Sequence, residues 1–459
     1  MTLKLSRILH AGYVFECEGS QIAFDPIFEN PFSRNCHAFP DVRFHVEQIR
    51  QVRFAAVFIS HFHDDHCSME SLDLLDRSTP IYLYCQFEEM FAMIRELGFA
   101  KVYALETDVA VTLGPFTVTP REALDADVDS MFQIQAGGMN VLNVVDSWIA
   151  PVALTVLAQQ APWDMVLWPF QTMREVEVLS PSRAQGQPAT LPAEWIDQLR
   201  VLDPRYIVPS SCQFVQEPWS WYNHAFFPIS YRQFQDEIEA ALPGARVARL
   251  NPGVAVLLDA NGLTMAAPLP WVVPVGEQDV DYDYRPDIAA PDIAQIASRF
   301  PALNAALAAR VKDYCRNGLL EKYRAMELEE GGYFDQPRLW SLTVYAHDQS
   351  CQQFFYRVEG DKIAAAEEGS AALAWTTEIA QQKLYAALEL GESLTSMYLR
   401  INDRVFAPPE EAALGEAELV DDPLIRCLFN DAFGAYQAAQ LRRLGIRPAQ
   451  DCTDRHSGG

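Results

Sequence analysis

Three histidines and two aspartates fall within six residues, HFHDDH from His61 to His66. The run follows an apolar segment, residues 54–60, that is predicted to be a buried strand. In an extended segment every second side chain points to the same side, so His61, His63 and Asp65 converge on one pocket. His66 follows at a turn and serves a neighbouring ion. Imidazole and carboxylate groups gathered in this way are metal ligands. The sequence therefore predicts a fold that places a metal site at the end of a strand.

With this HxHxDH motif the chain resembles the metallo-β-lactamase superfamily over about residues 3–260. The opening segments LHAGYVFE and IAFDPIF, predicted to form a hairpin, are similar to the opening of its phospholipase D-like and lactonase-like members. The resemblance implies an α/β fold, the αβ/βα sandwich, with two metal ions in a cleft at its edge. It also implies that Asp25 accepts a hydrogen bond from a ligand and that His10 faces the cleft and touches substrate. A turn-forming Asp-Pro pair and a capped hairpin residue are the alternatives for these two positions.

Asp146 ends an apolar strand, VLNVVD, at the place where the superfamily has its bridging aspartate. A carboxylate in this position can span two cations. The other interpretation is that Asp146 caps the helix predicted for IAPVALTVL. We expect the ligand role.

The histidine that the superfamily places between the motif and Asp146 is missing from this chain. The segment that should supply it, FTVTPREALDADVDS, offers acidic residues instead: Glu122, Asp125, Asp127 and Asp129. Glu122 comes directly off the strand and is the predicted ligand, with Asp125 second. An acidic surface loop is the alternative.

The last histidine of the superfamily is also absent, and Ser211 or Cys212 occupies its place in YIVPSSCQFV. His224 follows soon after and is a candidate ligand if the chain folds back to the cleft. A packed histidine and a buried structural thiol are the plainer interpretations of His224 and Cys212.

These replacements make the predicted ligand set more anionic than a zinc hydrolase needs. One ion would take His61, His63, Glu122 and Asp146, and the other Asp65, His66 and Asp146. Carboxylate-rich sites with open positions favour iron or manganese over zinc. The chain is also similar to the diiron oxygenase and CMP-sialic acid hydroxylase-like branches of the superfamily.

That resemblance implies a diiron oxygenase that oxidises a small or carrier-bound organic substrate with O₂, with electrons from an external donor. Glu122, Asp146 and His10 would be its catalytic residues. Two alternatives are a zinc-dependent hydrolase of a phosphodiester or lactone and a non-catalytic metal-binding scaffold.

The predicted organisation is a catalytic domain over residues 1–262, a Pro/Asp-rich linker or strap over 263–292, an α+β domain over 293–450 and a disordered tail over 451–459. The α+β part faintly resembles sterol-carrier-protein-2-like domains, which bind apolar ligands or dimerise, so a homodimer is one expectation.

The composition of the chain limits the classes of partner that we expect it to bind. The net charge of −27 repels phosphate backbones, which argues against nucleic acid. We expect no membrane span and no secretory signal, because no apolar run is long enough. Nine cysteines without a spacing pattern indicate free thiols and a cytoplasmic location.

Overall fold

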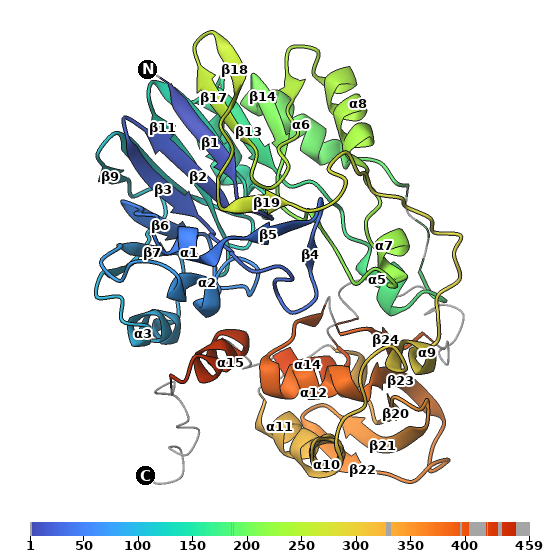
Figure 1. The fold of residues 1–459 in the computed structure, drawn as a ribbon. Coiled ribbons are helices and arrows are strands. Elements are labelled where there is room, and N and C mark those ends of the chain that lie inside the picture. Colours follow the sequence, from blue (N-terminus) through green and yellow to red (C-terminus); the bar gives the residue numbers. More distant parts are fainter. Residues whose placement is uncertain are drawn as a thin grey trace.

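The computed structural model describes residues 2–446 except 185, 187, 327–331, 395–396, 404–418, 420 and 430–433. Two large mixed sheets form the N-terminal part and a smaller sheet forms the C-terminal part (Figure 1). The predicted tail, 451–459, lies outside the described residues, as do 447–450 of the predicted α+β domain.

The first sheet has eight strands and carries the predicted opening hairpin, which is formed by β2 and β3. From edge to edge its order is β18 (Gly262–Ala266), β17 (Ala255–Asp259), β1 (Leu3–Arg7), β2 (Tyr13–Cys17), β3 (Ser20–Phe24), β6 (Ala56–Ile59), β7 (Ile81–Leu83) and β8 (Val102–Ala104). The strands from β3 to β8 are parallel, so their carboxyl ends meet at one edge.

The second sheet has seven strands. Its order is β16 (Arg246–Val247), β14 (Tyr206–Pro209), β13 (Met165–Trp168), β12 (Met139–Asn143), β11 (Ser130–Ala136), β10 (Phe116–Glu122) and β9 (Val111–Leu113). Strands β12, β13 and β14 run parallel, as crossovers through helices require.

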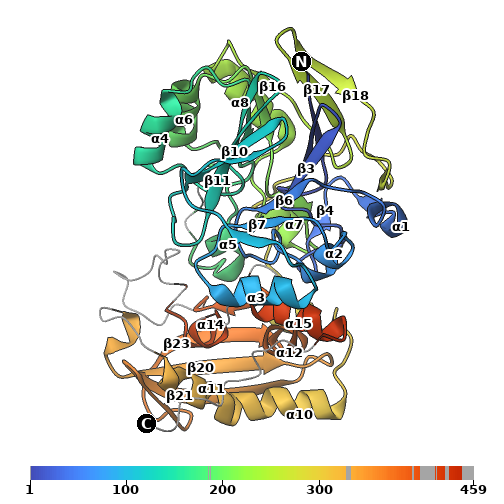
Figure 2. The ribbon, with the colours of Figure 1, turned by 90° about the vertical axis from the view of Figure 1, so that its left-hand side faces the viewer.

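Alternating apolar residues give each sheet two buried faces. Phe15, Phe24 and Phe58 of the first sheet meet Phe132 and Val141 of the second in the core between the sheets. The opposite face of the first sheet is covered by α2 (Met69–Asp73) and α3 (Glu88–Glu96), and that of the second by α4 (Pro151–Ala158), α6 (Ala193–Leu202) and α8 (Tyr231–Ala241). The predicted αβ/βα sandwich is therefore confirmed (Figures 1 and 2).

Shorter elements complete the N-terminal part. They are α1 (Val46–Ile49), α5 (Glu175–Leu179), α7 (Tyr222–Ala225), and the strand pairs β4 (His37–Ala38) with β15 (Phe214–Val215) and β5 (Val42–Phe44) with β19 (Val272–Pro274).

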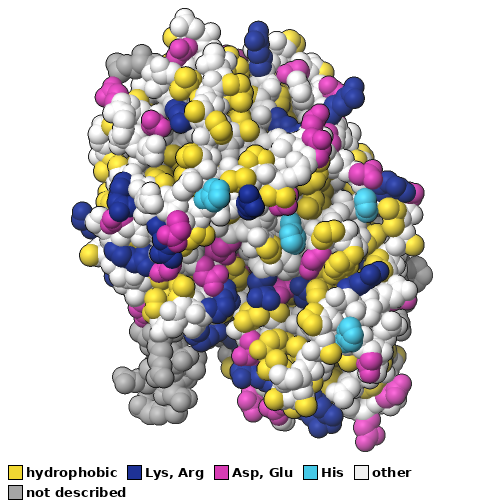
Figure 3. Space-filling view, viewed as in Figure 1, with side chains coloured by type: hydrophobic (Ala, Val, Ile, Leu, Met, Phe, Trp, Pro, Cys, Tyr) yellow, Lys and Arg dark blue, Asp and Glu magenta, His cyan; other side chains and the backbone are white. Residues whose placement is uncertain are grey.

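Figure 3 shows acidic and basic side chains interspersed over one face of the molecule.

The C-terminal sheet has the order β22 (Lys362–Ala365), β21 (Cys351–Glu359), β20 (Arg338–Tyr345), β23 (Leu373–Ala380) and β24 (Leu399–Ile401). Strands β20 and β21 form a hairpin, and β23 runs directly into helix α12 (Gln381–Leu390). The other helices described are α9 (Ile293–Ala297), α10 (Ala305–Asp313), α11 (Leu319–Ala325), α14 (Pro423–Phe429) and α15 (Ala435–Arg443).

The segment 263–292, predicted as a linker or strap, contains strand residues in two places. Strand β18 continues to Ala266, and β19 pairs with β5. Strand β19 ends at Pro274 in a two-stranded sheet, where both strands are edges and proline is tolerated. Farther along, Tyr282 is buried against the ring of Phe227, with ring centroids 5.3 Å apart. The segment thus packs along the N-terminal part.

Helix α15 returns to the N-terminal part and packs against α2, α3 and α12. Figure 2 shows α3 and α15 side by side where the two parts of the molecule meet. Among the helices that the structure describes, none is long and apolar enough to cross a membrane.

Candidate metal centre

The HFHDDH loop lies between the end of β6 and the start of α2. Two amides of the loop, those of His66 and Cys67, donate to the carbonyl of His63 at 3.1 and 2.9 Å and close it into a tight turn. Ser68 then caps α2 by accepting from the amide of Ser71 at 3.2 Å. The loop is therefore fixed at both ends, which holds its side chains in defined directions.

Asp25 holds this loop from behind, as the family resemblance implies. Its carboxylate is fully buried and accepts hydrogen bonds from the amide and hydroxyl of Ser60, both at 2.7 Å. It also lies 3.0 Å from Nδ1 of His66. A carboxylate can only accept there, so Nδ1 of His66 carries the proton and Nε2 of the neutral ring presents a lone pair.

That Nε2 atom belongs to the first group of potential ligands, His10, Asp65, His66 and Asp146, whose ligand atoms all lie within 4.8 Å of one another. The His66 Nε2 atom is 3.0 Å from Asp146 Oδ2 and 3.6 Å from Asp65 Oδ1. A neutral imidazole lone pair and two carboxylate oxygens are all acceptors, so they repel one another unless a proton or a metal cation lies between them.

The shifted pKa values of His66 and Asp146 have the same cause, which is the close approach of these groups. Burial alone would lower the pKa of His66, but Asp146 and then Asp65 outweigh it and hold that pKa well above its usual value. Burial would raise the pKa of Asp146, yet the neighbouring His66 and His61 hold it well below its usual range. Without a metal ion, the carboxylates draw a proton onto His66; a metal cation would take that proton's place.

His10 plays a different part in this group. The backbone amide of Cys212 donates to His10 Nδ1 at 3.1 Å, so Nδ1 accepts and the proton of the ring lies on Nε2. That Nε2 is 3.0 Å from Asp65 Oδ2 and 3.2 Å from His66 Nε2. His10 thus presents an N–H donor to the ligands, whereas a metal ligand must present a lone pair.

The second group is His61, His63 and Asp129, again with ligand atoms within 4.8 Å of one another. Ser60 gives its hydroxyl proton to Asp25, so its oxygen accepts from Nδ1 of His61 at 2.9 Å. His61 Nε2 is therefore a lone pair, and it is buried without a hydrogen-bond partner. Oδ1 of Asp129, 3.8 Å away, is likewise buried and without a partner.

The two groups adjoin. The rings of His61 and His66 have centroids 4.0 Å apart, and Asp146 Oδ1 is buried without a partner. Burial, and next the Asp146 carboxylate, raises the pKa of Asp129 to about 6. Burial and the neighbouring His66 ring lower the pKa of His61 well below its usual value, which keeps it a neutral ligand. These unpartnered acceptors fit two adjacent metal cations with Asp146 between them.

The backbone before Asp146 is strained in a way that sets its direction. Val145 has a φ of 64°, a conformation that β-branched residues rarely adopt. Its carbonyl accepts from the hydroxyl of Ser211 at 2.7 Å and its amide donates to Asn143 Oδ1 at 3.1 Å. Helix α4 is capped by Ala150, so the structure excludes the alternative that Asp146 is its N-cap.

The predicted ligand Glu122 does not join either group, and neither does Asp125. Glu122 ends β10 and pairs in the ladder with Ser130 of β11. The turn between them brings Asp129 back to the centre, because the amide of Asp129 donates to the carbonyl of Asp125 at 2.8 Å. The sequence favoured Glu122 because it ends the predicted strand. The closed turn, which no local pattern indicates, brings Asp129 into the second ligand group instead.

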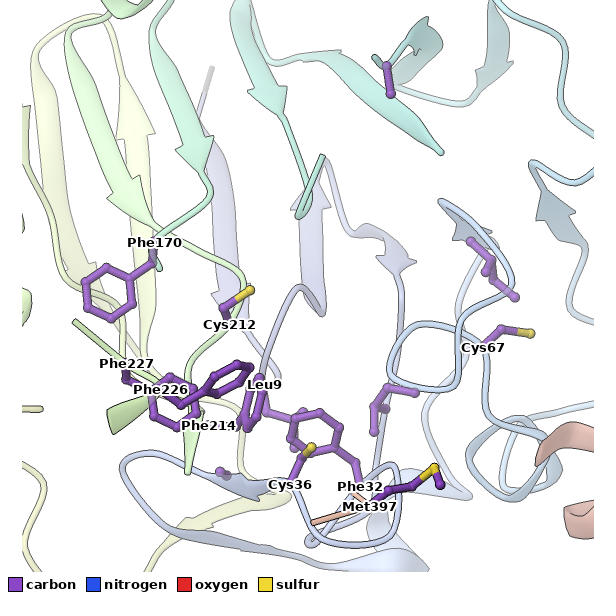
Figure 4. Close-up of a cluster of buried hydrophobic side chains, with 14 of the residues drawn as sticks. Leu9, Phe32, Cys36, Cys67, Phe170, Cys212, Phe214, Phe226, Phe227 and Met397 are labelled. Atoms are coloured by element: carbon purple, nitrogen blue, oxygen red, sulfur yellow. The ribbon is translucent and has the colours of Figure 1, made fainter. Parts of the chain in front are cut away.

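His224 also lies outside both groups. Its Nδ1 atom donates to the carbonyl of Asp283 at 3.0 Å, within the strap that follows β19. Cys212 is buried, and burial raises the pKa of its thiol well above the usual value. Figure 4 shows Cys212 beside an aromatic cluster that includes Phe214, Phe226 and Phe227. The structural interpretations of His224 and Cys212 are the ones this packing supports.

Comparison with known proteins returned no matching family model and no matching curated protein. Several solved structures are similar in part. A metallo hydrolase from Ignicoccus hospitalis, Igni18, is 17% identical and covers 56% of this chain and 99% of its own, with a TM-score of 0.39. The metallo-β-lactamase fold protein YhfI from Bacillus subtilis is 14% identical, with coverages of 56% and 99% and a TM-score of 0.38.

CmlA, a diiron β-hydroxylase from Streptomyces venezuelae, is 16% identical and has a TM-score of 0.37. The similarity covers 56% of this chain and 53% of CmlA, so the chain spans about half the length of that protein. Likenesses with TM-scores this low carry no information about activity.

Proposed function

We propose that this protein is a dinuclear metal enzyme and that its metal ions are iron. The observation that supports the proposal is the pair of adjoining ligand groups, in which His61 Nε2, Asp129 Oδ1 and Asp146 Oδ1 are buried acceptors without a hydrogen-bond partner. His61, His63 and Asp129 would hold one ion, and His66 and Asp65 the other. Asp146 would bridge them.

The second group, His61, His63 and Asp129, offers two imidazoles and one carboxylate. This is the combination that leaves open positions on non-haem iron in oxygenases. Three carboxylates over two ions make the centre anionic, which depresses the Lewis acidity that hydrolysis needs and stabilises oxidised iron. When bound, such an iron pair supplies O₂ binding and electron transfer for the oxidation of a C–H or N–H bond. The electrons would come from an external donor, and manganese is the other metal that suits these ligands.

The chain's own residues supply orientation and a proton. Asp25 and Ser60 fix the rings of His66 and His61 so that both Nε2 atoms face the centre. His10 holds a proton on Nε2 within the first ligand group, where it hydrogen-bonds to Asp65. The amide of Cys212 keeps that proton on the nitrogen that faces Asp65 and His66.

Reactivity with O₂ tests the proposal. The protein is loaded with iron, reduced without oxygen, mixed with air-saturated buffer, and its O₂ uptake is followed. We expect uptake that scales with iron content and that is lost in the His66→Ala variant. No uptake, together with zinc-dependent cleavage of a phosphodiester or lactone, would favour the hydrolase, because two histidines and one carboxylate also bind catalytic zinc.

A further inference from the structure

Helix α15 of the C-terminal part brings two glutamine side chains onto the loop that carries HFHDDH. Gln437 is 2% exposed and Gln440 is fully buried, although glutamine is usually found at the surface. A buried side-chain amide destabilises a protein unless its hydrogen bonds are made. The partners of these two side chains lie in the ligand loop, at the start of α2 and on Glu29.

The side-chain NH₂ group of Gln437 joins the two ends of the ligand loop. It donates one hydrogen bond to the carbonyl of Phe62 at 2.8 Å and one to the carbonyl of Cys67 at 2.9 Å. An NH₂ group has two protons, so these two bonds use its full donor capacity. Residues 63–66, three of which belong to the ligand groups, lie between the two carbonyls. One side chain therefore fixes the backbone on both sides of three potential ligands.

Gln440, one turn farther along α15, holds the start of α2. Its side-chain oxygen accepts from the amide of Met69 at 2.7 Å, and its NH₂ group donates to the hydroxyl of Ser68 at 2.8 Å. The amide of Met69 belongs to the first turn of α2, where backbone donors have no partner within the helix. The two glutamines together anchor the chain from Phe62 to Met69.

Two close approaches fix the position of α15 itself. Gly391, the C-cap of α12, lies against its first turn, and a Cβ atom on this glycine would be 2.3 Å from the backbone nitrogen of Tyr436. A Cβ atom on Gly434, the N-cap of α15, would be 2.7 Å from Cε of Met93 in α3. Figure 2 shows α15 between α3 and α12. The helix is thus held by both parts of the molecule.

His63 is the ligand that depends most on this anchoring. The first ligand group has support of its own, because Asp25 lies behind His66. The side chain of His63, in the second group, is exposed, and none of the residues that the structure describes forms a hydrogen bond with its ring. Its direction is therefore set by the backbone on either side of it, which Gln437 holds.

We propose that α15 positions the metal-binding loop, and that Gln437 and Gln440 are positioning residues of the metal centre. The inference rests on the proposed function, since it requires metal ions at the two ligand groups. It makes the geometry of the second group depend on a contact that joins the two parts across 370 residues of sequence.

Titration with Co²⁺ tests the inference, because this ion binds to imidazole and carboxylate ligands and its visible absorption depends on their geometry. Metal-free full-length protein is compared with the Gln437→Leu variant, which loses both hydrogen bonds to the loop. We expect one of two Co²⁺ ions to bind about 10-fold more weakly, as is typical when a ligand loses an outer partner, and its absorption bands to shift. Unchanged affinities and spectra for both ions would overturn the inference.

Two further variants separate positioning from a general loss of stability. Arg443→Ala, on the same helix, removes only a contact with Glu70 at 2.7 Å and should change neither affinity nor spectrum. Gly391→Ala lies outside the loop but must displace the start of α15, so it should weaken the same ion as Gln437→Leu. Equal weakening by Arg443→Ala, or wild-type affinity in Gly391→Ala, would contradict the positioning role of α15.

Hydrogen exchange in the metal-free protein separates this inference from the proposed function. The amides of His66 and Cys67 close the ligand loop, and we expect both to exchange faster in Gln437→Leu than in the wild type. Faster exchange in a protein that binds no Co²⁺ would support the anchoring by α15 and contradict the metal centre. Unchanged exchange in a protein that binds two Co²⁺ ions would overturn the anchoring and leave the metal centre intact.

Discussion

The two ligand groups differ in how the protein supports them. Around His66 the supporting contacts come from behind: Asp25 takes the proton of Nδ1, and the amide of Cys212 fixes the ring of His10. The side chain of His63, in contrast, is exposed. The difference indicates that the first group is the rigid half of the centre and the second group is its open half.

The largest effect should come from removing the imidazoles of the open half. Replacing His61 and His63 together by Ala leaves Asp129 with no imidazole beside it, so we expect the open half to bind no metal and at most one ion per chain to remain, held by Asp65, His66 and Asp146. Elemental analysis of the purified variant measures this. A double variant that keeps its full complement of metal would place the site elsewhere.

Next in size is the loss of one carboxylate. Asp129→Ala should leave one metal ion per chain, because the rigid half keeps Asp65, His66 and Asp146. Glu122→Gln is the matched control and should keep both ions, since Glu122 lies outside the ligand groups. The opposite pattern, with metal lost from the Glu122 variant, would restore the prediction made from the sequence.

That pair of variants marks the limit of what the sequence could predict. HFHDDH lies at the end of its own strand, so the local pattern was enough to single it out, and the resemblance to the superfamily pointed to Asp25 and Asp146 at two further strand ends. Asp129 depends on a closed turn between two paired strands. The direction of the His10 proton depends on an amide 202 residues away, and no local pattern specifies such a contact.

The fold, like the candidate site, has elements that the sequence predicts and elements that it does not. The strands and helices of the sandwich follow from apolar alternation and period. Strand β19 was missed because its partner, β5, lies far away in the sequence, whereas β18, which pairs with the preceding strand β17, lies at the predicted domain boundary. The return of α15 to the ligand loop left no signal, since its contacts are made by two glutamines of an ordinary amphipathic helix.

A smaller effect is expected from the support of the rigid half. Asp25→Asn keeps the shape of the side chain but removes the carboxylate that takes the Nδ1 proton of His66. Loss of such an outer partner typically weakens metal affinity by about 10- to 100-fold. Competition with a metal-binding dye measures the affinity. An unchanged affinity would show that the rigid half does not need Asp25.

The smallest effect on metal content is expected at His10. His10→Ala removes the N–H donor but no lone-pair ligand, so both metal ions should remain while O₂ uptake by the reduced protein slows. Loss of one ion in this variant would show instead that His10 is a ligand, with its proton on the other nitrogen.

The number and identity of the metal ions in the full-length protein test the central claim most directly. The protein is produced in medium with iron, zinc and manganese at equal concentrations, and each metal is counted per chain by mass spectrometry. We predict two ions per chain, with iron in excess over zinc. Two zinc ions and no iron would contradict the oxygenase, and no bound metal would contradict the dinuclear centre itself.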